Sequence, residues 1–191
     1  MSKNDWHIYT GKIPYSPKGA FWVSFESDPD LTRTKANIYG RCLPCIQNLY
    51  VQLKDGENQI RLGSAYNCWK ITATVTGIDE CLALLAQFEK NYPHGHVYGK
   101  FGSGRPNSET RVVVFHADTP TERDRIQNAL NSCLTSIERN ETAQISRACA
   151  VLFDDILGPW QDWQPITSIK YPRNVKSQLD KIKKILYQSS M

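Results

Sequence analysis

The sequence predicts an α+β domain in which helices cover one face of an antiparallel sheet. Three observations lead to this class. Apolar residues before position 76 alternate with a period of two, as in strands, and from Ile78 the period changes to 3.6, as in helices. Between Trp69 and Glu138 the order strand, helix, hairpin, helix matches most of a split β-α-β unit, the arrangement of ferredoxin-like domains. A closing fourth strand is not evident after Glu138, so we expect extra N-terminal strands to extend the sheet.

The N-terminal strands are predicted from short apolar runs bounded by turn residues. Residues 21–27, FWVSFES, form the first run. Residues 49–53 and 59–65 are expected to pair as two strands, because the Asp55-Gly56 between them is a common tight-turn signal. Residues 69–75 are the next expected strand.

The helices are predicted from apolar stripes and from residues typical of helix ends. One stripe ends at Pro93, and a second helix has Thr119 as its cap, Pro120 in its first position and Glu122 completing a capping box. A third helix ends at Gly158-Pro159. The four expected stripes are Ile78, Cys81, Leu82, Leu85, Phe88 and Tyr92; Ile126, Ala129, Leu130, Cys133, Leu134 and Ile137; Ile145, Cys149, Leu152, Phe153 and Ile156; and Val175, Leu179, Ile182 and Leu186.

The length favours one domain with a docked extension. With 191 residues and 21.8 kDa, we expect a single α+β domain over residues 1–158 and a C-terminal extension over 159–191 that carries a docked amphipathic helix. Trp160 and Trp163 are expected to fix that extension to the body. The terminal helix could alternatively dock on a second subunit, which would make a homo-oligomer.

Composition limits the classes of function. The formal net charge of +4, from 23 basic and 19 acidic residues, permits contact with phosphates but is low for a dedicated duplex-DNA binder. No apolar run approaches the roughly 20 residues of a membrane span, and the N-terminus lacks the apolar core of a signal peptide. We therefore expect a soluble, cytoplasmic protein with no membrane partner. No P-loop or G-x-G-x-x-G fingerprint is present in the sequence.

A hairpin that holds three of the four histidines is the expected working surface. If its loop spans residues 102–110, Phe101 faces Arg111, His96 lies opposite His116, and His94 lies opposite Asp118. One face of this hairpin is then apolar and suits a core beneath helices. That face consists of Val97, Phe101, Val113 and Phe115, and the other face carries His96, Tyr98, Lys100, Val112, Val114 and His116.

Two chemistries fit the hairpin. In the first, basic side chains and the backbone amides of a glycine-containing loop bind phosphate, while Tyr98 or a histidine stacks on a base. The residues proposed for phosphate are Tyr98, Lys100, Gly102, Gly104, Arg105 and Arg111. In the second, a divalent metal such as zinc is held by His94, His96 and His116, with Asp118 as a fourth ligand or an orienting group. An ordinary solvated loop with surface histidines is the alternative to both.

Residues 42–45, Cys-Leu-Pro-Cys, are a rival motif among six otherwise scattered cysteines. A proline before the second cysteine also occurs in thioredoxin-like redox sites, where a helix N-terminus lowers the pKa of the first cysteine. Because residues 46–53 are predicted as a strand, we interpret the motif as a proline turn with two incidental thiols.

The function expected from the sequence is a binding or regulatory module. Phosphate-bearing small molecules, nucleotides or single-stranded nucleic acid are the favoured ligands. A metal-dependent hydrolase at the same histidines, and a structural subunit of a protein assembly, are the alternatives, and the sequence leaves open whether the protein is an enzyme.

Overall fold

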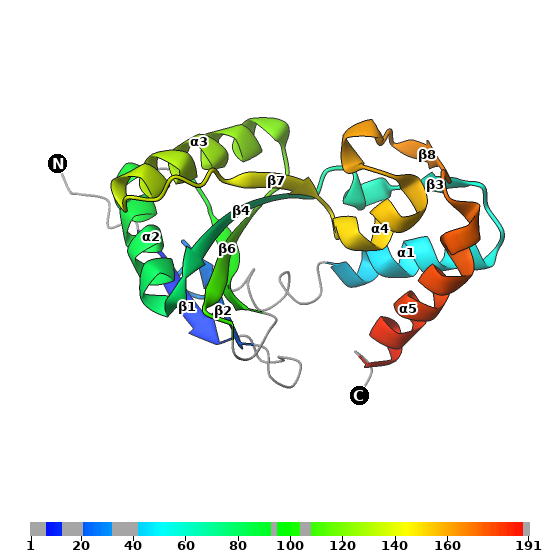
Figure 1. Cartoon of the computed structure of the whole chain (residues 1–191), viewed down its shortest axis with the longest axis horizontal. Helices are drawn as coiled ribbons and strands as arrows, with labels where there is room; N and C mark the ends of the chain where they lie inside the picture. The colour runs from blue at the N-terminus through cyan, green and yellow to red at the C-terminus, as the bar shows by residue number, and fades with distance from the viewer. Residues whose placement is uncertain (1–6, 13–20, 32–41, 93–94, 104–107, 189–191) are drawn as a thin grey trace. The chain divides into compact units, whose positions relative to one another are not determined.

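A computed structural model describes residues 7–12, 21–31, 42–92, 95–103 and 108–188. The chain forms two compact units (Figure 1). The first comprises Met1–Tyr39 and Trp69–Ile145, and the second comprises Gly40–Cys68 and Ser146–Met191. The expected organisation, a single domain over residues 1–158 with a docked extension over 159–191, stays a prediction. The compact units each draw on two separate stretches of chain.

The first unit is built on an antiparallel sheet, and the α+β class is confirmed. The strands of the sheet are β1 (Tyr9–Lys12), β2 (Phe21–Glu26), β4 (Trp69–Thr76), β5 (Tyr98–Ser103), β6 (Thr110–Ala117) and β7 (Gln144–Arg147), the last two residues of β7 being counted with the second unit. They lie in the order β1-β2-β5-β6-β4-β7. The closing strand that was not evident in the sequence after Glu138 is present, because β7 lies at the edge of the sheet beside β4. Its four residues are too few to show a clear alternation in the sequence.

Two helices cover one face of this sheet in Figure 1: α2 (Gly77–Asn91) and α3 (Pro120–Ser136). Both were predicted, and the Thr119 cap of α3 is confirmed, because the Glu122 amide donates to Thr119 Oγ1 over 3.1 Å. The return bond of the expected capping box is shifted by one residue, since it is the Asp118 amide that donates to the Glu122 carboxylate, over 3.0 Å. The core beneath the helices centres on Phe115, whose ring lies 4.8 Å from Phe25 and 4.5 Å from Phe88 between centroids.

The hairpin of β5 and β6 has a register two residues away from the expected one. Phe101 pairs with Val113, not with Arg111, and Gly102 pairs with Val112. The physical reason is that β5 continues through Ser103, so Gly102 belongs to the strand and not to the loop. An even shift leaves the faces unchanged, since side chains alternate with a period of two. The predicted core face is therefore confirmed: Val97, Phe101, Val113 and Phe115 are all buried.

The second unit contains α1 (Cys42–Lys54), β3 (Gln59–Arg61), α4 (Ala150–Leu157), β8 (Ile166–Ser168) and α5 (Val175–Gln188). Short 3₁₀ turns span Gly63–Ala65, Trp160–Asp162 and Pro172–Asn174. Strands β3 and β8 pair antiparallel. The core of this unit contains Leu49, Ile60, Phe153, Trp163 and Ile182. Trp163 is 1% exposed and donates from Nε1 to the Gly158 carbonyl over 2.9 Å, so it packs as the sequence predicted.

The predicted strand at residues 49–53 is wrong, because this segment belongs to α1. Its buried residues Ile46, Leu49 and Leu53 recur with the spacing of a helix face. The Asp55-Gly56 signal ends a helix and does not make a hairpin. Gly56 has φ +76°, its amide donates to Leu53, and the next amide donates to the Gln52 carbonyl over 3.0 Å, which is a Schellman cap. Of the expected strand at 59–65, only Gln59–Arg61 is a strand.

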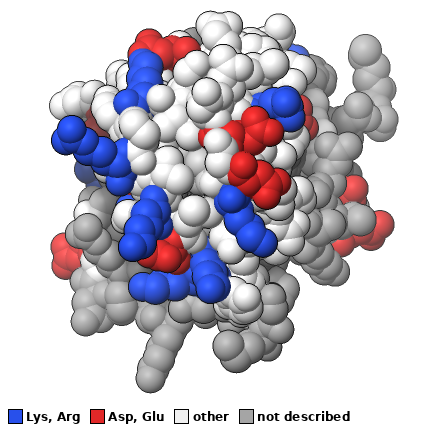
Figure 2. All heavy atoms as spheres, turned by 90° about the vertical axis from the view of Figure 1, so that its right-hand side faces the viewer, with Lys and Arg blue, Asp and Glu red and all other residues white. Residues whose placement is uncertain are grey.

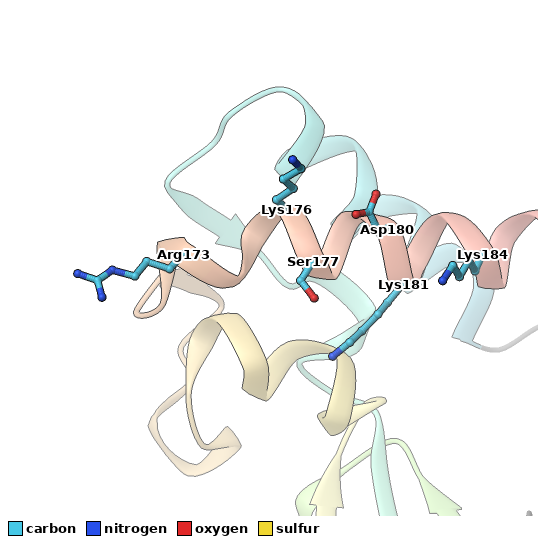
Figure 3. Close-up of a pocket in the computed structure, with 6 residues that line it drawn as sticks. All are labelled: Arg173, Lys176, Ser177, Asp180, Lys181 and Lys184. Carbon is cyan, nitrogen blue, oxygen red and sulfur yellow. The ribbon is translucent and has the colours of Figure 1, made fainter.

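Helix α5 is amphipathic and docks within its own unit. Ile182 is fully buried, and Val175, Leu179 and Leu186 pack against the same core. Its outer side borders a surface hollow of about 490 Å³, lined by Arg173, Lys176, Ser177, Asp180, Lys181 and Lys184 (Figure 3). Lys181 extends toward α4 and donates to Asp155 over 2.7 Å. Figure 2 shows basic side chains on this side of the molecule interspersed with acidic ones.

Candidate functional site

A row of four ionisable side chains crosses the sheet on the face opposite α2 and α3. Glu26 on β2 pairs with Tyr98 on β5. The Tyr98 ring stacks on His116 of β6, with centroids 5.6 Å apart and an interplanar angle of 23°. His116 in turn pairs with Lys70 on β4. A carboxylate, a phenol, an imidazole and an amine are thus neighbours on four adjacent strands.

Three members of this row are buried. Glu26 is 0% exposed, Tyr98 is 2% exposed and His116 is 5% exposed. Transfer of a carboxylate out of water is costly unless hydrogen bonds or a cation compensate its charge. A fully buried glutamate beside other polar groups therefore indicates a site in which a negative charge is compensated.

A further contact joins the residue just after β2 to the residue just before β5. The Ser27 amide donates to the Val97 carbonyl over 2.9 Å, and the Val97 amide donates to Ser27 Oγ over 3.0 Å. These bonds extend the contact between β2 and β5 by one residue pair beyond Glu26 and Tyr98. Asp28 lies in the bend that follows, two residues after the end of β2.

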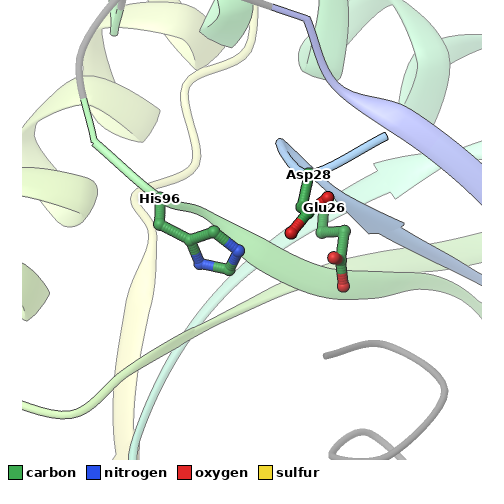
Figure 4. Close-up of side chains that lie close together, drawn as sticks. All are labelled: Glu26, Asp28 and His96. Atoms are coloured by element: carbon green, nitrogen blue, oxygen red, sulfur yellow. The ribbon is translucent and has the colours of Figure 1, made fainter. Parts of the chain in front are cut away.

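The side chains of Glu26, Asp28 and His96 converge where β2 ends and β5 begins (Figure 4). Each offers one ligand atom, and these three atoms lie within 4.8 Å of one another. Atoms that bind one ion at about 2.1 Å lie within roughly 4.2 Å of each other, so a small side-chain adjustment would bring all three onto an ion. Of the residues that the structure describes, this is the one group of three or more histidine, cysteine or acidic side chains that meets this spacing.

The donor set is suited to a divalent first-row metal. Two carboxylates and an imidazole are oxygen and nitrogen ligands of the kind that zinc, manganese and iron(II) accept. Three protein ligands leave coordination positions for water or substrate. The cluster, referred to below as the acid–histidine cluster, consists of Glu26, Asp28 and His96.

The corrected register changes the neighbours of the metal ligands proposed from the sequence. His96 is part of the acid–histidine cluster. The expected pairing of His96 with His116 is wrong, because the register brings Tyr98 rather than His96 beside His116, and the Tyr98 ring lies 5.6 Å from each imidazole between centroids. Asp118 accepts from the Tyr98 hydroxyl over 3.4 Å. His94 lies outside the described residues.

The proposed phosphate ligands do not share one face. The Lys100 ammonium lies 4.3 Å from the centre of the Trp22 ring, on the same face as Tyr98. Arg111 is on the odd-numbered face beneath the helices, where its charge acts on Cys81 of α2, and its Nη1 donates to the Thr110 carbonyl over 3.1 Å. Gly102 lies in β5 with φ +144°, whereas Gly104 and Arg105 lie outside the described residues.

Sequence reasoning missed Glu26, Asp28 and Lys70. The available signal was the alternation in β2, where Trp22, Ser24 and Glu26 form the face opposite the apolar residues. That pattern places Glu26 on the polar face but does not identify the strand beside it. The pairing of β2 with β5 joins segments more than 70 residues apart, and it brings both acids to His96.

Comparison with protein-family models, with curated proteins and with solved structures found no significant match to this chain. None of the helices in the described ranges combines the length and the apolar composition that a membrane span needs.

Proposed function

We propose that the first unit binds a divalent metal ion at Glu26, Asp28 and His96 and uses it in metal-assisted hydrolysis. The observation that carries this proposal is the convergence of three ligand atoms within 4.8 Å, one of them on a glutamate that is 0% exposed. A bound divalent ion would compensate the charge of the buried Glu26 carboxylate, which burial otherwise disfavours, together with that of the partly exposed Asp28.

The neighbouring row supports hydrolytic chemistry. A metal ion in such a site would supply Lewis acidity and would activate water near neutral pH. The Tyr98 ring contacts both His96 of the cluster and His116. His116 is therefore placed near the cluster, where it can donate a proton to a leaving group. Phosphate-bearing ligands, the class favoured by the sequence, suit a metal of this kind because their oxygens bind it directly.

Metal content of purified, untagged protein tests the proposal. The protein is loaded with zinc or manganese, dialysed and analysed for bound metal, alongside Glu26→Gln, Asp28→Asn and His96→Ala. Near-stoichiometric metal in the wild type and a loss in each variant are expected. His7→Ala is the matched control, because His7 also contacts a glutamate, Glu89, over 2.9 Å, but outside the cluster.

His116→Ala separates this proposal from the ligand set predicted by the sequence. The proposal requires that His116→Ala retain its metal, because His116 is not one of the three converging ligands. Loss of metal from His116→Ala with retention in Glu26→Gln would favour the histidine set. Absence of metal from loaded wild type would reject both sets.

A second candidate function is the binding of phosphate-bearing ligands or single-stranded nucleic acid on α5. It is supported by the hollow that Arg173, Lys176, Lys181 and Lys184 line. Such binding should weaken with salt, and each lost phosphate contact should reduce the slope of log affinity against log salt by roughly 0.7 for a single strand. Lys176→Ala and Lys184→Ala should each show this reduction, whereas Lys90→Ala on α2 should not. Salt-insensitive affinity would contradict the proposal.

The ferredoxin-like arrangement of the first unit is likewise a proposal. The order β5-β6-β4-β7, with α2 and α3 as the connections on one face, supports it. The remaining alternative, a subunit of an assembly, has less support from α5, because its apolar stripe packs within its own unit. Size-exclusion chromatography with light scattering tests that alternative, and a monomeric mass would reject it.

A further inference from the structure

We propose that Cys42 and Cys45 form a redox-active dithiol that exchanges with disulfide-containing substrates. This inference concerns the second unit and is independent of the metal proposal. One reason against it was that the residues after Cys45 were predicted to form a strand. That reason is removed, because Cys42 is the first residue of the 13-residue helix α1.

The helix brings the two thiols into reach of each other. Residues three apart lie on the same side of a helix, with Cβ atoms about 5–6 Å apart. A disulfide needs Cβ atoms roughly 4 Å apart, so the first turn has to tighten only slightly. Pro44 lies within this first turn, where the missing amide hydrogen costs no helical hydrogen bond. Both cysteines are thiols in the structure.

The two thiols differ in accessibility. Cys42 is partly exposed, whereas Cys45 is 9% exposed and its Sγ lies 3.3 Å from Ser64 Oγ. An outer thiol can reach a substrate disulfide, and an inner thiol can reach only the outer one. This difference assigns Cys42 as the attacking thiol and Cys45 as the resolving thiol.

The electrostatics of the first turn favour a thiolate at Cys42. The amides at the start of a helix lack acceptors within the helix, and they stabilise negative charge nearby. The first turn of α1 contains no acidic residue that would oppose this charge. Cys149 offers a comparison within the same unit, because it is also partly exposed and precedes the first residue of α4. Its i+3 residue is Leu152, so it has no resolving thiol at that spacing.

The exchange is balanced in two steps. The Cys42 thiolate attacks one sulfur of the substrate disulfide, a mixed disulfide forms, and the other substrate sulfur leaves as a thiolate. The Cys45 thiolate then attacks Cys42 Sγ, which releases the second substrate thiolate and forms the Cys42–Cys45 disulfide. The protein loses two electrons and two protons, and the substrate gains them as two thiols.

The full-length protein, equilibrated with oxidised and reduced glutathione, tests the inference. After an acid quench, thiols are alkylated and peptides are analysed by mass spectrometry. We expect one intramolecular disulfide, between Cys42 and Cys45. Cys45→Ser should accumulate glutathione on Cys42, and Cys42→Ser should lose the reaction. In the wild type, iodoacetamide at pH 7 should modify Cys42 about 10-fold faster than Cys149.

Cys149→Ser is the matched control and should behave as the wild type does. A disulfide between Cys42 and Cys149, glutathione on Cys149 in preference to Cys42, or absence of the Cys42–Cys45 disulfide at every glutathione ratio would overturn the inference. The wild-type disulfide map and alkylation rates decide the question even if a serine variant fails to fold.

Discussion

Tyr98 stacks on His116 across the β5–β6 pair, with ring centroids 5.6 Å apart. This contact follows from a register in which Gly99 pairs with Phe115. It places Tyr98 beside His116, where a two-residue shift would have set His96. The Tyr98 ring contacts both imidazoles, and of the two histidines only His96 belongs to the acid–histidine cluster.

Tyr98 is expected to act as a positioning residue for the metal ligand His96. Removing the ring in Tyr98→Ala should weaken zinc binding by about 10-fold, the lower end of effects for groups that orient a ligand. Tyr98→Phe keeps the ring and should bind zinc nearly as the wild type does. Competition with a chromophoric chelator measures both affinities. Equal affinity of Tyr98→Ala and Tyr98→Phe would exclude a positioning role for the ring.

Gly99 is expected to tolerate no side chain. A Cβ at this position would overlap the Val114 carbonyl oxygen and lie 2.5 Å from Phe25 Cζ, so backbone or core would have to move. Gly99→Ala should lower the free energy of unfolding by about 3 kcal/mol, as overpacking does. Urea denaturation measures this change.

Gly56→Ala is the comparison for Gly99→Ala, because a Cβ there meets no atom within 4 Å and only the φ of +76° is unfavourable. Its cost should be about 1 kcal/mol. If Gly56→Ala were the more destabilising of the two, the packing argument for Gly99 would be wrong.

Glu80 is expected to make stability depend on acid pH. Its carboxylate accepts from the Thr76 amide over 2.8 Å and pairs with Arg139, and these contacts hold its pKa below the ordinary value of 4.5. The folded protein then loses this stabilisation as the pH falls below about 4.5, where the unfolded chain takes up the proton first. Glu80→Gln should therefore be less stable than the wild type at pH 6.

The measurement for Glu80 is urea unfolding of the wild type and Glu80→Gln at pH 6 and at pH 3. The stability difference between them should shrink at pH 3. A difference that is the same at both pH values would show that the charge of Glu80 does not contribute.

Cys81 is expected to make stability fall at alkaline pH. Burial raises the pKa of this thiol from 9.0 to about 11. Between these values the unfolded chain releases the proton and the folded protein keeps it, so unfolding becomes more favourable as pH rises. The pKa values of Cys133 and Tyr92 are also raised by burial, and they act in the same direction.

Unfolding free energies at pH 8 and pH 10 test this expectation. Cys81→Ala should be less stable than the wild type at pH 8, because a buried side chain is shortened. From pH 8 to pH 10 the wild type should lose more stability than Cys81→Ala does, since the variant lacks this titration. Parallel losses in both proteins would contradict the assignment.

The sequence by itself determined the elements whose signals are local. The stripe from Ile78 and the Thr119 cap predicted α2 and the start of α3 because a helix repeats every 3.6 residues and its cap depends on neighbouring residues. The alternation in β5 and β6 predicted which face of the hairpin is buried. This prediction survived the error in register, since a shift of two residues preserves the face.

Only the tertiary structure decided the identity of α1, the hairpin register and the composition of the candidate site. The segment of residues 46–53 is short and mainly apolar, so its periodicity alone did not distinguish a strand from a helix. Packing in the second unit selects the helix. The register depends on where β5 ends. Glu26 and Asp28 reach His96 because β2 pairs with β5, and pairing between strands distant in sequence depends on the whole sheet, which no local pattern specifies.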